Sequence, residues 1–143
     1  NTLYPYRDAV EALVRTVSPQ ILREDFIRVP AALALGIYGD QRAIDVLVKV
    51  LGIKEAEAER AARQKAVRLQ CARSLSMIYR ATAIAPVKEA YDALLKWCVE
   101  DGDYEIELAC GQALGNSKLT SEQRREVMKA RRVKRETYTA EDP

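Results

Sequence analysis

The sequence predicts an all-α fold, an α-solenoid of about three and a half antiparallel helix pairs. Apolar residues recur at helical spacing in seven segments, and the connections between these segments are short, which makes consecutive helices antiparallel neighbours. Every second segment repeats at a nearly constant offset, as stacked helical repeats do. Hydrophobic residues make up 48% of the chain and aromatic residues only 6%, a balance that favours helices packed through small and aliphatic side chains.

Turn residues separate the first three expected helices. The first begins near Pro5, which suits the first helical position, and runs to about Val17. The second covers roughly residues 22–38 and contains Pro30, where we expect a kink or a late start, because proline lacks the N–H that a helix interior uses. The third spans about residues 41–51 and stops at a glycine.

Composition and proline indicate the fourth and fifth helices. The segment from Lys54 to Ala62 is rich in strong helix formers and extends a fourth helix that continues to about Arg80. Pro86 opens the fifth helix, whose apolar side chains recur at helical spacing along one face.

Capping residues predict the last two helices. Asp103 can cap the sixth, and Thr120 and Gln123 have the spacing of a capping box for the seventh, which runs to about Arg135. We therefore expect one helical repeat domain over residues 1–135 and a flexible C-terminal tail over residues 136–143.

The even-numbered helices superimpose. The segment from Arg28 to Gly36 aligns with the segment from Arg68 to Ser76 at an offset of 40, and a third copy ending at Gly115 follows at an offset of 39. Small residues in register let adjacent helices approach closely, and a constant leucine fills the layer between repeats. The small positions are Ala31, Cys71 and Cys110, then Ala32, Ala72 and Gly111, then Ala34, Ser74 and Ala113, and the constant position is Leu35, Leu75 and Leu114.

The segment from Arg28 to Asp40, followed by residues 43–51, resembles a HEAT repeat of the bacterial subtype first noticed in phycobilisome lyases. The resemblance covers nearly the whole chain, although the third copy has Glu107 where the motif has arginine. It implies a right-handed superhelix in which the second helix of each pair lines a concave surface. It also implies that Arg28 and Arg68 are structural residues that pair with an acid near the turn. This architecture carries many unrelated activities, so function has to be argued from the surface.

Several function classes are disfavoured by what the sequence lacks. Histidine is absent, which removes the commonest general base and the commonest metal ligand. We therefore expect no catalytic site, no metal site, no cofactor and a protein that is not an enzyme. The three cysteines lie within helical patterns and have no CxxC spacing, which indicates buried, reduced thiols. Since no apolar run approaches the roughly 20 residues that span a bilayer, we expect a cytoplasmic protein. The start at Asn1, without Met, suggests a piece of a longer protein.

The acidic run over residues 100–107 alternates carboxylates, as the start of a calcium loop does. Such a loop needs glycine at its sixth position and a bidentate glutamate at its twelfth. Counted from Asp101, these positions hold Ile106 and Gln112. We predict instead a capped turn whose acids lie at a helix N-terminus.

A row of side chains on the fourth helix is the first candidate binding surface. From Arg60 to Arg80 there are six basic residues and no acid. The row and the equivalent row on the second helix would be neighbours on the concave face that the resemblance implies, and apolar residues beside arginine suit a protein partner. The alternative is a solvated face with scattered apolar side chains. This partner stripe consists of Leu33, Ile37, Arg63, Gln70, Arg73, Met77 and Arg80.

The seventh helix is the second candidate surface. Between residues 118 and 135 it carries eight basic residues against two acidic ones, a local net charge of +6. Such a helix can contact phosphate or an acidic partner through Arg124, Arg125, Arg131 and Arg132. The alternatives are a terminal helix with a charged outer face, or a junction to a following repeat.

These surfaces leave three hypotheses about function. The leading one is a non-enzymatic protein–protein interaction scaffold that binds a partner, of unknown identity, on the concave face of the solenoid. The HEAT subtype alone suggests a second, a bilin lyase or chromophore-handling subunit that acts with a partner chain. The third is nucleic-acid binding through the last helix, which the absence of interleaved aromatic residues disfavours.

Overall fold

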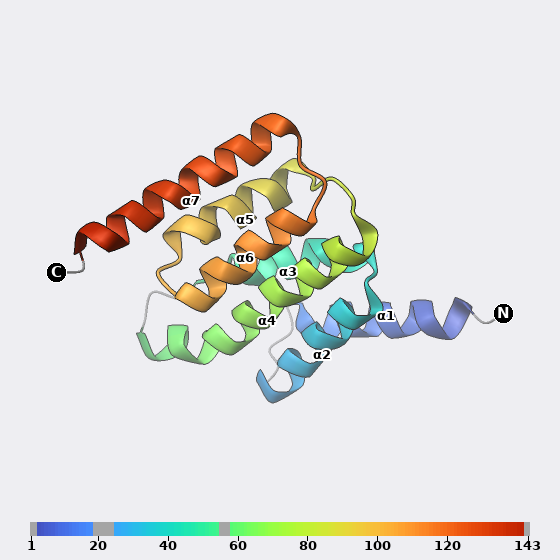
Figure 1. The fold of residues 1–143 in the computed structure, drawn as a ribbon. Coiled ribbons are helices and arrows are strands. Elements are labelled where there is room, and N and C mark those ends of the chain that lie inside the picture. Colours follow the sequence, from blue (N-terminus) through green and yellow to red (C-terminus); the bar gives the residue numbers. More distant parts are fainter. Residues whose placement is uncertain (1–2, 19–24, 55–57, 142–143) are drawn as a thin grey trace.

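The computed structural model describes residues 3–18, 25–54 and 58–141 of the chain (Figure 1). In this part of the chain there are seven α-helices. They are α1 (Leu3–Val17), α2 (Asp25–Tyr38), α3 (Ile44–Leu51), α4 (Ala58–Thr82), α5 (Lys88–Glu100), α6 (Tyr104–Asn116) and α7 (Ser121–Glu141), with a 3-10 turn, η1 (Gln41–Ala43), leading into α3. None of the helices in these ranges is both long and apolar enough to cross a bilayer.

The helices form two layers (Figure 1). The even-numbered helices α2, α4 and α6 lie side by side in one layer, and α1, α3, α5 and α7 succeed one another in the other. Helices α1, α3 and α5 each pack against the even helix that follows them. The predicted α-solenoid of about three and a half helix pairs is therefore confirmed in the described residues.

The repeat positions form the core as predicted. Leu35, Leu75 and Leu114 are fully buried. At the crossing of α2 and α4, a Cβ added to Gly36 would lie 2.8 Å from the Oγ of Ser74, and that hydroxyl donates a hydrogen bond of 2.6 Å to the carbonyl of Ala32. Small residues are therefore required here because the two helix backbones come into direct contact.

Several predicted boundaries are wrong. Helix α7 continues to Glu141, so its predicted end near Arg135 is six residues too early; the flexible tail over residues 136–143 stays a prediction. Residues 136–141 contain no glycine or proline, so no strong helix breaker ends the helix near Arg135. Helix α5 begins at Lys88, after Val87 at its N-cap, so Pro86 precedes the helix rather than opening it. Lys54 lies outside α4.

Pro30 does not delay the second helix. Helix α2 runs from Asp25 with Pro30 inside it, and the predicted start near residue 22 lies outside the described residues. Pro30 is exposed, so solvent can reach the Phe26 carbonyl that proline leaves without its helical hydrogen bond.

Candidate interaction surfaces

A buried arginine links the second and third helix pairs. Arg68 is only 4% exposed, and its Nε donates a hydrogen bond of 2.8 Å to the carbonyl of Leu51 at the end of α3. Its Nη2 lies 2.5 Å from Oδ1 of Asp101, and its guanidinium lies over the Trp97 ring, 5.0 Å from the centroid. Arg28 makes the corresponding bond, of 3.0 Å, to the carbonyl of Val17 at the end of α1. The predicted pairing with an acid near the turn is confirmed for Arg68, whereas Arg28 donates to a carbonyl. Because Arg68 is buried, it does not contribute to the exposed basic surface.

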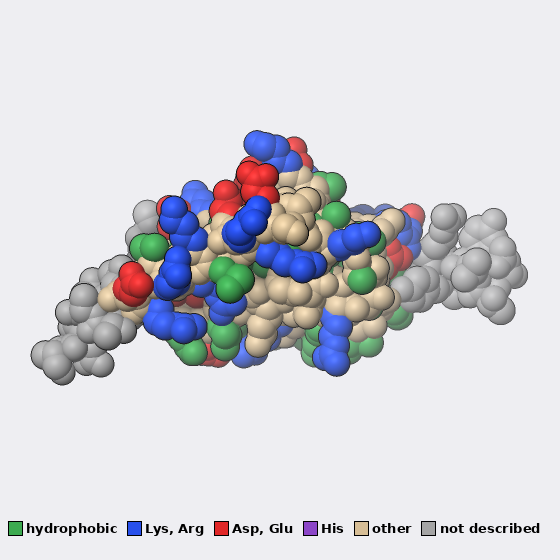
Figure 2. All heavy atoms as spheres, turned by 45° about the horizontal axis from the view of Figure 1, so that its top comes forward, with side chains coloured by type: hydrophobic (Ala, Val, Ile, Leu, Met, Phe, Trp, Pro, Cys, Tyr) green, Lys and Arg blue, Asp and Glu red, His purple; other side chains and the backbone are tan. Residues whose placement is uncertain are grey.

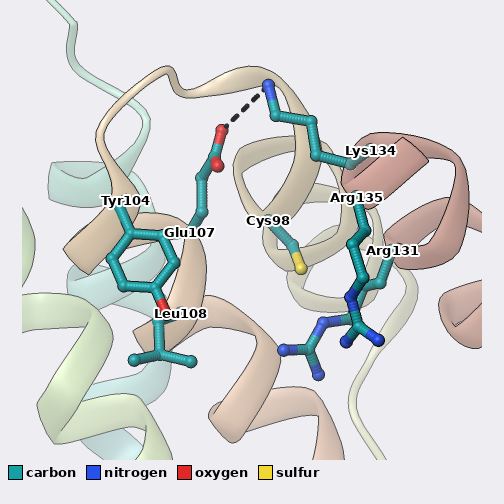
Figure 3. A pocket seen from close by; sticks show the side chains of 7 residues that line it. All are labelled: Cys98, Tyr104, Glu107, Leu108, Arg131, Lys134 and Arg135. Atoms are coloured by element: carbon teal, nitrogen blue, oxygen red, sulfur yellow. Dashed lines mark ion pairs between the residues drawn. The ribbon is translucent and has the colours of Figure 1, made fainter. Parts of the chain in front are cut away.

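In the third helix pair, an acid takes the place of this arginine. Glu107, at the position that Arg28 and Arg68 occupy in the other pairs, is 6% exposed. Its Oε2 accepts a hydrogen bond of 2.9 Å from the Gly102 amide and lies 3.4 Å from Nζ of Lys134 (Figure 3). The acid is thus on α6, and α7 supplies the cation.

The acidic run forms the capped turn that the sequence predicts. Oδ1 of Asp103 accepts a hydrogen bond of 3.1 Å from the Ile106 amide at the start of α6, and Oδ2 lies 3.1 Å from Nζ of Lys65. Partial burial acts to raise the pKa of Asp103, but these hydrogen bonds from Ile106 and Lys65 outweigh it and lower the pKa below its usual value. Within the described residues, no group of three or more His, Cys, Asp or Glu side chains could hold a metal ion.

The basic part of the partner stripe is less positive than the sequence suggested. Oε2 of Glu105 on α6 lies 3.4 Å from Nη2 of Arg73, and Oε1 lies 3.2 Å from Nζ of Lys65. Glu105, the acid in both ion pairs, lies on the neighbouring even-numbered helix, about one repeat further along the chain. Counting charges along α4 alone therefore missed them, although stepping forward by one repeat would have found Glu105.

The other α4 members of the partner stripe differ in exposure. Arg80 is exposed and Met77 is half-buried. Gln70 is half-buried and donates a hydrogen bond of 3.2 Å to the Ser74 hydroxyl, so its amide is engaged within α4. The side chain of Arg63 lies outside the described residues.

The apolar part of the stripe is longer than predicted. Leu33 is 41% exposed and Ile37 68% exposed, and Phe26, 72% exposed, precedes Leu33 by seven residues on the same face of α2. We call Phe26, Leu33 and Ile37 the α2 apolar row. The heptad-like spacing was visible in the sequence, but Phe26 was not assigned to this face.

A groove lies between α6 and α7, with a volume of about 180 Å³ (Figure 3). Arg131 lies across α6 at Gly111, where an added Cβ would come 2.9 Å from its Cζ. Arg131 is thus the one member of the predicted α7 set that lines this groove, while Arg124, Arg125 and Arg132 are exposed on α7. In Figure 2, Lys and Arg side chains spread across the face that includes α7, with single hydrophobic side chains between them. This C-terminal groove is lined by Cys98, Tyr104, Glu107, Leu108, Arg131, Lys134 and Arg135.

All three thiols are free and buried, as predicted. Burial raises the pKa of Cys71 and of Cys110 to about 12. Burial also raises the pKa of Cys98, although the nearby Arg131 opposes the shift. Because the thiolate is the reactive form of cysteine, these thiols are poor nucleophiles near neutral pH.

The stacked helix pairs and buried crossing residues define the chain as a helical-repeat protein of the α-solenoid class. Residues 27–52, which extend from α2 through η1 and α3, match the family model of the PBS lyase HEAT-like repeat. The resemblance noted from the sequence is thereby confirmed for this one repeat of the phycobilisome-lyase type. Neither the comparison with curated proteins nor that with solved structures finds a match.

Proposed function

We propose that the chain is a non-enzymatic protein–protein interaction scaffold that binds a partner segment on its concave face, the face lined by the exposed side of the even-numbered helices. The exposure of the α2 apolar row beside Arg73 and Arg80 of α4 carries this proposal. Exposed apolar side chains gathered on one face are typical of surfaces that meet a partner. An apolar centre with arginine beside it is also the usual composition of a protein interface.

The two parts of the surface have different roles in binding. Burial of the α2 apolar row supplies affinity, at roughly 1.5–3 kcal/mol for each large side chain that becomes fully buried, less the entropy lost on association. Arg73 and Arg80 attract an acidic partner segment, and the ion pair with Glu105 weakens this attraction at Arg73. The partner that fits best is an amphipathic segment with an apolar face and acidic residues along one edge.

The family name suggests a different function, in which the chain handles a bilin together with a partner chain. Covalent chemistry by this chain's own thiols would need a thiolate. Cys71 and Cys110, with pKa values of about 12, and the buried Cys98 do not provide one near neutral pH. The interaction scaffold is therefore the better supported function.

The test is affinity capture with the chain as bait, compared between variants. Ile37→Asp places a charge in the α2 apolar row and, because Ile37 is 68% exposed, changes folding stability by no more than about 0.5 kcal/mol. Val87→Asp is the matched control, because Val87 is 63% exposed and occupies the N-cap of α5, where aspartate is favoured.

We expect a protein that the wild type and Val87→Asp retain and that Ile37→Asp loses. The double variant Arg73→Glu, Arg80→Glu should lose the same protein. Equal capture by all variants, with circular dichroism unchanged, would refute the assignment of this face. A changed absorption spectrum on adding a bilin to the protein would favour the chromophore-handling alternative instead.

A further inference from the structure

Helix α7 occupies the place of the first helix of a fourth pair. Helices α1, α3 and α5 each pack against the even helix that follows, but in the described residues no even helix follows α7. The α7 side chain Met128, which lies on the same side of α7 as Arg131 and Arg135, is 71% exposed. The surface that such an even helix would cover is therefore open on both α7 and α6.

The side of α6 that would receive another helix carries small and apolar residues at the positions where the side of α2 that receives α4 does, and glycine is identical at one of them. We call Leu108, Gly111 and Gly115 the α6 seam; each lies 79 residues, or two repeats, after its counterpart on α2. At Gly36, the counterpart of Gly115, an added Cβ would lie 2.8–2.9 Å from atoms of Ser74 on α4. At Gly115 an added Cβ would meet nothing within 4 Å.

The leucine of the α6 seam is also more exposed than its counterpart on α4. Leu69, the counterpart of Leu108 on α4, is 9% exposed, and its own side of α4 faces α6. Leu108 is 38% exposed. The seam thus retains the small and apolar residues of a helix-packing surface, with only Arg131 lying across it at Gly111.

The charge beside the seam is positive. Arg131, Lys134 and Arg135 line the C-terminal groove, and Glu107 is its single acidic lining residue. The close-up shows Tyr104 and Leu108 on the α6 side of the groove and the three basic side chains on the α7 side (Figure 3). An occupant that complements both walls has an apolar, small-residue face next to an acidic face.

We infer that the C-terminal groove binds an acidic amphipathic helix of a protein partner, which packs on the α6 seam as the even helix of a fourth pair. Gly115 admits the close backbone approach that α4 makes at Gly36. Acidic side chains on the bound helix pair with Arg131 and Arg135. This surface lies at the C-terminal end of the solenoid and is separate from the α2 apolar row. The inference about the groove therefore does not depend on the proposed function.

Charge favours this occupant over the other two classes. A second copy of the chain carries a net charge of +2 and has the same basic α7, so the basic α7 side of the groove does not attract it electrostatically. A nucleic acid would complement the positive charge of the groove. The glycines of the seam, however, favour close contact between helix backbones, which a nucleic acid cannot make.

The test uses a matched pair of synthetic helices and the whole 143-residue chain. The probe is residues 66–82 of this chain, the part of α4 that packs on α2, with Arg68→Glu, Arg73→Glu, Arg80→Glu and Cys71→Ala. Its control keeps the three arginines, so the two peptides differ only in the sign of their charge. Binding of each fluorescently labelled peptide is followed by anisotropy at low and high salt.

The matched protein variants are Gly115→Met and Gln112→Met. Methionine at position 115 projects into open space in the free protein, so its circular dichroism and thermal midpoint should not fall, yet it blocks the approach of a helix backbone. Gln112 is exposed on the outer face of α6, off the seam, and its replacement should leave binding unchanged.

We expect the acidic peptide to bind more tightly than the basic one, to lose affinity as salt rises, and to bind at least about tenfold more weakly to Gly115→Met than to Gln112→Met. Equal binding of the two peptides, no binding, or no effect of Gly115→Met would overturn the inference. Concentration-dependent self-association that Gly115→Met abolishes would assign the groove to a second copy. Oligonucleotide binding as tight as that of the acidic peptide would assign it to nucleic acid. Ile37→Asp should leave peptide binding unchanged, so this test does not depend on the proposed function.

Discussion

Two glycines at equivalent positions in the repeat should respond to alanine in opposite directions. At Gly36 an added Cβ would lie 2.8 Å from Oγ and 2.9 Å from both Cα and Cβ of Ser74. The methyl group must push α4 away from α2, which costs about 1–3 kcal/mol in an overpacked contact. It also disturbs the hydrogen bond from Ser74 to the Ala32 carbonyl, which contributes about 0.5–1.5 kcal/mol.

At Gly115 the same methyl group meets nothing within 4 Å. Alanine there gains the helix-propensity difference from glycine, about 0.8–1 kcal/mol in a helix interior and less near the helix end. Gly36→Ala gains the same propensity, so the difference between the two variants isolates the packing and hydrogen-bond costs, about 1.5–4.5 kcal/mol.

The assay is urea unfolding followed by circular dichroism, with midpoint and slope compared between variants. We expect Gly36→Ala to be less stable than the wild type and Gly115→Ala to be as stable or more stable. Changes of the same sign and size in both variants would refute the claim that α4 contacts α2 at Gly36 while the equivalent place on α6 is open.

Three further predictions concern the buried pair, the N-cap and the thiols. Asp101→Ala should destabilise the protein by about 3–5 kcal/mol in urea unfolding, because it leaves Arg68 buried without its counter-ion; a change below about 1 kcal/mol would contradict this. Asp103→Ala should cost about 0.5–2 kcal/mol at pH 7. Because folding lowers the pKa of Asp103, that stabilisation is complete above its unfolded pKa of about 3.9 and is lost as the pH falls through the folded value, so the gap between Asp103→Ala and the wild type should close in acid titrations. The three cysteines should react with iodoacetamide at pH 8 only as fast as the chain opens, because burial raises their pKa values, and mass spectrometry that finds rapid labelling of the folded protein would contradict that.

Local signals in the sequence predicted local structure well. The capping box at the start of α7 is present, with Thr120 N–H donating 3.0 Å to Oε1 of Gln123 and Gln123 N–H donating 3.1 Å to Oγ1 of Thr120. The repeat offsets of 40 and 39 placed the small residues at the helix crossings. Both signals depend only on spacing along the chain, which a single sequence shows directly.

Contacts between repeats were harder to predict because they depend on how neighbouring helices are placed. Stacking puts a residue beside the one that follows it by one repeat, as in the pairs Lys65 with Glu105 and Ser76 with Asn116, each 40 residues apart. The offset of 40 that revealed the repeat therefore also predicts that Glu105 lies beside Lys65, where it reduces the positive charge of the basic surface. The end of α7 was missed for a different reason: the apolar periodicity ends near Arg135, but no glycine or proline between residues 136 and 141 stops the helix there.

The inverted charge of the third pair connects the repeat to the C-terminal groove. In the first two pairs, arginine at this position bonds to the carbonyl that ends the preceding helix, and Arg68 also pairs with the acid in the next turn. Glu107 cannot donate to a carbonyl, and it accepts instead from the Gly102 amide and from Lys134 of α7. The ion pair between Glu107 and Lys134 ties a basic stretch of α7 to α6 beside the seam, and Arg131 and Arg135 of this stretch supply the positive charge at this end of the solenoid. A departure from the repeat pattern that looks like a defect in the sequence thus creates the chemical asymmetry on which partner choice at this end would depend.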